Sequence, residues 1–108
     1  MKKKGNLIII GSGDLAREVI DLNSDIDDFN SKGFNILGLV DEKKNPDLEF
    51  PFYKNILDIP DFKEQNYCIA INDNSKRHLT ANKLEKYNLN KLPIYIQDNK
   101  DKFKEWID

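Results

Sequence analysis

The chain has 108 residues, a formal net charge of −2 and a hydrophobic fraction of 39%. This length supports one domain with one modest core, and the balanced charge argues against nucleic acid as a partner. No apolar run is long enough to cross a membrane, and the single cysteine, Cys68, excludes an internal disulfide or cysteine-built metal site and favours a cytoplasmic location.

The first predicted elements are a strand, a glycine turn and a helix. Asn6–Ile10 is a short isoleucine-rich run without helical period, which is typical of a buried parallel strand. Residues 14–23 then place apolar side chains at helical spacing, with Asp14 suited to the N-cap. A polar, acidic stretch at residues 24–32 follows this helix. Asn35–Val40 is the second predicted strand.

The second half of the chain continues the alternation. Residues 50–53 are apolar but interrupted by proline, so they form at best an edge segment. Residues 55–61 indicate a short helical turn. Residues 67–71 predict the third main strand. Residues 75–87 predict a helix, capped by Asn74 or Ser75, with Leu79, Lys83, Leu84 and Tyr87 on one face.

The last expected elements are a strand at residues 92–96 and an amphipathic helix at residues 99–107. Alternating strands and helices predict a single α/β domain over residues 1–108. We expect a small Rossmann-like three-layer domain with a short, mainly parallel sheet. In such sheets ligands bind at the carboxyl ends of the strands. The loops at residues 11–15, 41–44 and 72–75 are therefore the places to look for a binding site.

The first loop has the spacing Gly-x-Gly-x-x-Ala, from Gly11 and Gly13 to Ala16. Glycines allow a sharp turn and the approach of a phosphate, whose charge the backbone N–H groups of a following helix can bind. The same glycines also suit an ordinary turn, although the flanking strand and helix favour the ligand. Asp14 argues the other way, because a carboxylate at a helix start repels an anion.

The other two loops carry polar side chains that suit nucleoside or sugar recognition. Asp41 can accept hydrogen bonds from ribose hydroxyls or a base N–H, or it is a solvated turn residue. Asn72 and Asp73 can bind a sugar or base, but helix capping explains them slightly better. Arg17 could reach a phosphate, and the lone histidine, His78, indicates a helix surface rather than a metal site.

Three blocks of residues together resemble the N-terminal domain of NeuD/PglD-type sugar acyltransferases. They are Ile8-Ile9-Ile10-Gly11-Ser12-Gly13-Asp14-Leu15-Ala16-Arg17-Glu18-Val19, Ile36-Leu37-Gly38-Leu39-Val40-Asp41-Glu42 and Ala70-Ile71-Asn72-Asp73-Asn74-Ser75-Lys76-Arg77. The resemblance covers residues 6–96 and implies a domain that binds a UDP-linked or other nucleotide-linked sugar. It implies a diphosphate site at Gly11, Ser12, Gly13 and Leu15 with Arg17 nearby, a base or ribose site at Asp41 and Glu42, and closure by Asn72 and Asp73.

Two residues depart from the family pattern, since Asp14 and Asn72 stand where such domains tend to have glycine. In the family, acetyl-CoA-dependent catalysis belongs to a separate domain of hexapeptide repeats, and residues 97–108 show no such pattern. We therefore expect a nucleotide-sugar-binding module that has no catalytic residue and no cofactor of its own, and that pairs with itself or with a separate acyltransferase subunit. The alternatives are an NAD-binding domain, or an interaction module that docks through Phe103, Trp106 and Ile107.

Overall fold

The computed structural model describes residues 5–30, 33–87 and 90–92. Its elements in chain order are β1 (Asn6–Ile10), α1 (Asp14–Asn30), β2 (Asn35–Val40), β3 (Phe52–Tyr53), the single-turn 3-10 helices η1 (Ile56–Asp58) and η2 (Phe62–Glu64), β4 (Asn66–Ile69), α2 (Asn74–Glu85) and β5 (Asn90–Leu92). The alternation of strands and helices expected from the sequence is confirmed in this part of the chain.

The described strands form one parallel sheet with the order β3-β2-β1-β4-β5. From β1 the chain builds outward through β2 to β3. It then crosses back to the other side of β1 and continues with β4 and β5. The order therefore reverses between β1 and β4, which is the place where open α/β sheets bind their ligands. The fold is a small Rossmann-like α/β fold, as predicted.

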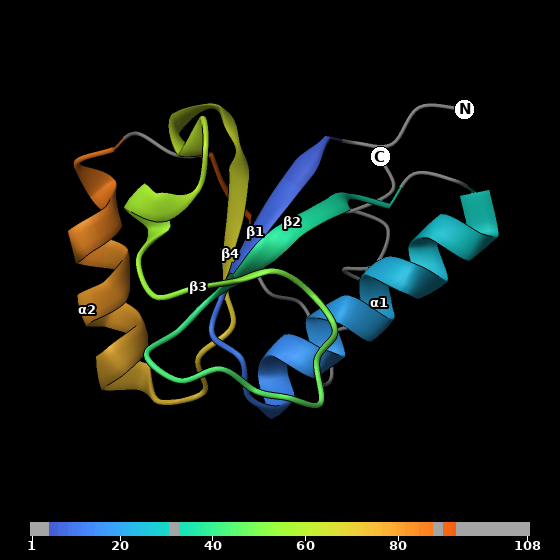
Figure 1. Cartoon of the computed structure of the whole chain (residues 1–108), viewed down its shortest axis with the longest axis horizontal. Helices are drawn as coiled ribbons and strands as arrows, with labels where there is room; N and C mark the ends of the chain where they lie inside the picture. The colour runs from blue at the N-terminus through green and yellow to red at the C-terminus, as the bar shows by residue number, and fades with distance from the viewer. Residues whose placement is uncertain (1–4, 31–32, 88–89, 93–108) are drawn as a thin grey trace.

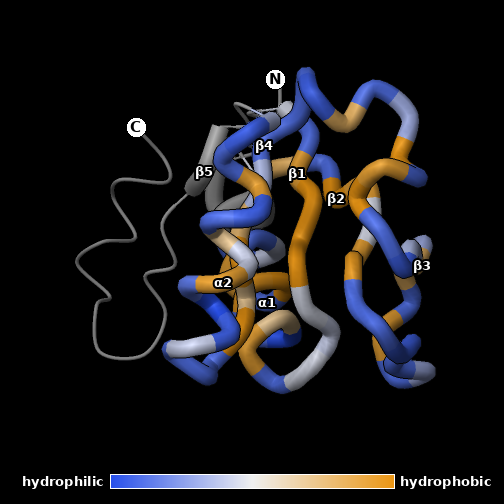
Figure 2. The backbone as a smooth tube through the Cα atoms, turned by 90° about the vertical axis from the view of Figure 1, so that its left-hand side faces the viewer, coloured by the Kyte–Doolittle hydropathy of each residue, from blue (hydrophilic) through white to orange (hydrophobic). Residues whose placement is uncertain are grey.

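The two helices cover opposite faces of the sheet (Figure 1). Leu7 and Ile9 of β1 pack in one core cluster with Val19 of α1. Ile8 and Ile10 belong to the second cluster, together with Leu84 of α2. Because side chains alternate along a strand and both faces are covered, every position of this run is apolar. Figure 2 shows the resulting concentration of hydrophobic residues in the central strands.

The first helix is longer than the sequence predicted, since α1 ends at Asn30 and not near residue 23. The polar side chain of Asn23 is buried, and its amide pairs with the backbone of Phe34. Its Nδ2 donates to the Phe34 carbonyl at 3.0 Å, and its Oδ1 accepts from the Phe34 N–H at 2.6 Å. Asn23, where the sequence predicted the end of the helix, therefore links α1 to the residue directly before β2.

Helix caps and strand ends also differ from the expectations. Asp14 is the first residue of α1 and not its N-cap, because the carbonyl of Gly13 accepts the helical bond from the N–H of Arg17. The N-cap of α2 is Asp73, rather than Asn74 or Ser75. The last described strand, β5, begins two residues before the predicted residue 92. The predicted helix at residues 99–107 lies outside the described residues.

Candidate functional site

The loops after β1, β2 and β4 meet because these strands end in register. Ile10 pairs with Val40 of β2 on one side and with Ile69 of β4 on the other. Two further backbone hydrogen bonds continue the sheet past the strand ends, from Gly11 N–H to the Val40 carbonyl and from Ala70 N–H to the Ile10 carbonyl. The loop residues that come after these strands line an open cleft of about 530 Å³. This volume is typical of small-ligand sites.

Gly11 is required by the geometry of this turn. Its φ is +120°, a backbone conformation that favours glycine. A Cβ atom here would lie 2.4 Å from the carbonyl oxygen of Ala70. Gly13 differs, since a Cβ there would meet nothing within 4 Å. The first glycine is therefore explained by the fold alone, and the second leaves open space beside the cleft.

A hydrogen-bond network fixes the first loop to the second. The hydroxyl oxygen of the buried Ser12 lies 2.8 Å from Asp41 Oδ2 and 3.1 Å from the Lys43 carbonyl, and its one proton is shared between these two acceptors. Asn45 Nδ2 donates to the Ser12 carbonyl at 2.7 Å. The second carboxylate oxygen of Asp41 accepts from the N–H of Glu42 at 2.6 Å. Since a carboxylate has about four acceptor positions, Asp41 can still accept bonds from a ligand while it holds the loop.

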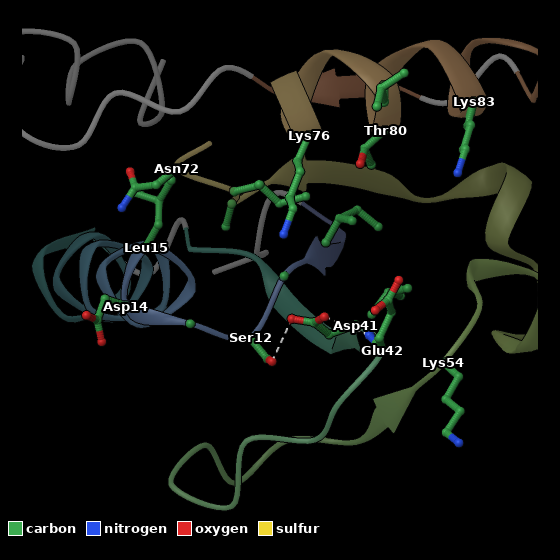
Figure 3. Close-up of a pocket in the computed structure, with 17 residues that line it drawn as sticks. Ser12, Asp14, Leu15, Asp41, Glu42, Lys54, Asn72, Lys76, Thr80 and Lys83 are labelled. Carbon is green, nitrogen blue, oxygen red and sulfur yellow. Dashed lines mark hydrogen bonds between the residues drawn. The ribbon is translucent and has the colours of Figure 1, made fainter. Parts of the chain in front are cut away.

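The start of α1 offers N–H groups to an anion. The Gly11 N–H is used in the sheet, whereas no hydrogen bond among the described residues uses the N–H groups of Asp14, Leu15 or Ala16. Such groups at a helix N-terminus, together with the helix dipole, attract negative charge. The carboxylate of Asp14 is exposed and points away from Ser12 and Asp41 (Figure 3). It does not close the cleft.

The lysines of α2 line the cleft opposite the acidic residues that follow β2, whereas Lys54 lies on the same side as Glu42 (Figure 3). Lys76 and Lys83 project from α2 and lie on the same side of that helix as Thr80, while Lys54 follows β3 (Figure 3). Asp41 and Glu42 lie at the end of β2. The cleft therefore combines acceptors for hydroxyl or N–H groups on one wall with cations for an anion on the other.

Eight of the ten residues that we proposed from the sequence line the cleft: Gly11, Ser12, Gly13, Asp14, Leu15, Asp41, Glu42 and Asn72. Arg17 and Asp73 do not line it. The exposed Arg17 is paired with Asp47 at 3.7 Å, and Asp73 accepts a bond from the Lys76 N–H at 3.0 Å as the cap of α2. Ligand binding by the other eight stays a prediction.

The sequence interpretation did not assign four polar residues of the cleft to the site: Lys54, Lys76, Thr80 and Lys83. Three of them recur at helical spacing along α2, which is the signal that could have found them. The sequence had also placed Leu79 on one face of this helix with Leu84, whose side chain is buried. The side chain of Leu79 is instead 60% exposed and lines the cleft.

Cys68 and His78 both lie outside the cleft. Cys68 is fully buried in β4, and burial raises the pKa of its thiol to about 12. His78 is exposed on α2 and does not line the cleft. In the described ranges no three His, Cys, Asp or Glu side chains are grouped to hold a metal ion.

No helix of the described residues has the length and apolar character to span a membrane.

Fold and cleft define a small Rossmann-like α/β domain, with its cleft at the switch point of the sheet. Residues 6–84 match the family described as the PglD N-terminal domain, and the chain belongs to this family. This result confirms the resemblance seen in the sequence. No curated protein matches the chain.

One solved structure similar to this chain is C. glutamicum DAP dehydrogenase in complex with DAP, with a TM-score of 0.63 and 13% sequence identity. The match covers 97% of this chain and 32% of the dehydrogenase chain. At this identity the likeness concerns the fold, and it supports the Rossmann-like class.

Proposed function

We propose that the cleft binds a nucleotide-linked sugar of the UDP-sugar kind, and that this domain binds the ligand without transforming it. One observation carries the proposal: the switch-point cleft joins the N-terminus of α1, the carboxylate of Asp41 and the lysines of α2. A nucleotide sugar offers a matching set of groups, namely hydroxyl and N–H donors on its nucleoside and negative charge on its diphosphate.

Each wall of the cleft has a part in this proposal. Asp41 accepts hydrogen bonds from the ribose or the base, in addition to the bond from Ser12. The diphosphate lies between the first turn of α1 and Lys76. Asn72, exposed at the mouth, can donate to or accept from the ligand. Membership of the PglD N-terminal family supports this ligand class.

In the acyltransferases that this chain resembles, acyl transfer belongs to a separate domain of hexapeptide repeats. Membership of the N-terminal domain family therefore supports a binding role for the cleft. In our proposal this chemistry, and the acetyl-CoA that it consumes, belongs to another domain or subunit. A homo-oligomer or a complex with an acyltransferase chain would bring the two together.

NAD is the second candidate, because Asp41 follows β2 at the position where dinucleotide-binding domains hold a ribose. Calorimetric titration with UDP, UDP-glucose and NAD⁺ separates the two. We expect heat with the uridine ligands, shifted NMR signals for residues 11–15, and about tenfold weaker binding by Asp41→Asn, because a hydrogen bond to a charged group is lost. Tighter binding of NAD⁺ would reverse the assignment. No heat and no shifts at millimolar ligand would refute both.

A further inference from the structure

A second hollow, which we call the side groove, opens from the switch-point cleft toward the end of α2. Its volume is about 460 Å³, and it shares Ile10, Val40, Lys54, Thr80 and Lys83 with the cleft. The remaining lining comes from the η1 region and from the last turns of α2: Asn55, Ile56, Leu57, Leu84, Lys86 and Tyr87. The two hollows therefore adjoin each other.

The side groove exists because the crossover from β3 to β4 is short. Its helical parts are only the single turns η1 and η2, whereas βα units ordinarily cover the sheet with a full helix. Figure 1 shows α2 and this crossover on the same side of the sheet, separate from α1. Between them lies a floor of buried apolar side chains, to which Ile10, Val40, Ile56 and Leu84 contribute.

The charge of the side groove differs from that of the switch-point cleft. Lys54, Lys83 and Lys86 line it, and no acidic residue among those described does. The cleft, in contrast, has Asp14, Asp41 and Glu42 as well as its lysines. The charged residues that line the side groove are therefore all cationic, and they favour a ligand group with a negative charge.

The walls of the side groove also have an apolar character. Leu57 is 50% exposed at its edge. Tyr87 is held in place by a perpendicular ring contact with Phe62 at 5.2 Å, and the Lys86 ammonium lies 5.1 Å from the centre of its ring. Asn55 uses its Oδ1 to cap η1, while its Nδ2 has no partner within the described residues. Apolar walls with an amide donor suit the C–H faces and hydroxyls of a sugar ring.

We infer that the side groove is a subsite for an acidic sugar ring, so that the ligand is a nucleotide linked to a sugar that carries a carboxylate. This inference rests on the proposed function, since the nucleotide occupies the adjoining cleft. The nucleoside lies against Asp41, the diphosphate lies beside Lys76, and the sugar carboxylate lies near Lys83 and Lys86 of the side groove.

The test compares two ligands that differ at a single position. UDP-glucose and UDP-glucuronate share the nucleotide and the ring, and only the second carries a carboxylate. By calorimetry at low salt we expect the Kd of UDP-glucuronate to be at least threefold lower, and NMR shifts at Leu57 and Tyr87 to be larger with this ligand. Because exposed charges are screened by ions, the preference should shrink at about 0.5 M salt.

Two variants connect this preference to the groove. The double variant Lys83→Gln and Lys86→Gln should bind both ligands with Kd values within about twofold of each other. Lys63→Gln removes an exposed lysine of η2 that lines neither hollow, and should keep the wild-type ratio. Equal affinities in the wild type, or a preference that survives the double variant, would overturn the subsite while the nucleotide-sugar site stands. Failure of both ligands to bind would overturn both proposals.

Discussion

Gly11→Ala is the substitution for which the structure gives the clearest quantitative expectation. Alanine at φ +120° adopts a conformation that is nearly exclusive to glycine, at a cost of about 1–3 kcal/mol. Its Cβ would also lie 2.4 Å from the Ala70 carbonyl oxygen. That contact is with backbone, so it is relieved only by moving β4 away from β1, where Ala70 N–H donates to the Ile10 carbonyl at 2.8 Å. Such overpacking costs a further ~1–3 kcal/mol.

The expected loss in the free energy of unfolding is therefore about 2–6 kcal/mol, measured by urea denaturation. For a domain of this size, 2 kcal/mol already lowers the melting temperature by roughly 8 °C or more. Gly13→Ala is the matched control, because its Cβ meets open space. Residue 13 precedes α1 at the N-cap position, where alanine is less favourable than glycine. We therefore expect the free energy of unfolding to change by no more than about 1 kcal/mol. If the two variants lost equal stability, the assignment of a structural role to Gly11 would be refuted.

Two further predictions concern the core. Asn23→Ala should lower the free energy of unfolding by about 1–3 kcal/mol, because it removes both hydrogen bonds to the backbone of Phe34. The control is Asn82→Ala at an exposed position of α2, which should change this free energy by less than ~0.5 kcal/mol. Similar losses in the two variants would contradict the role of Asn23. Since the pKa of the Cys68 thiol is about 12 in the fold and its ordinary value is 9.0, the unfolded chain releases this proton first. The contribution of Cys68 to stability is thus complete below pH 9 and declines as the pH rises toward 12. Denaturation across that range should show a steeper decline for the wild type than for Cys68→Ala, and parallel curves would argue against burial of the thiol.

Local patterns in the sequence determined the fold class and part of the site. The isoleucine run of β1 indicated a strand that is covered on both faces, because every one of its positions had to be apolar. The glycine turn and the helical period after it identified the strand–turn–helix unit. Parallel strands end at the same edge of a sheet. The sequence alone therefore predicted that the loops containing Ser12, Asp41 and Asn72 lie side by side.

The tertiary structure decided the features that depend on residues distant in the chain. Asn23 continues a helix because its partner is Phe34, and nothing near Asn23 in the sequence indicates that pairing. Arg17 pairs with Asp47, outside the cleft. Lys54 and Lys83 meet in one groove only because the crossover after β3 lies opposite α2. Periodicity reports which side of its own element a residue occupies, whereas the neighbour on that side depends on how the elements pack.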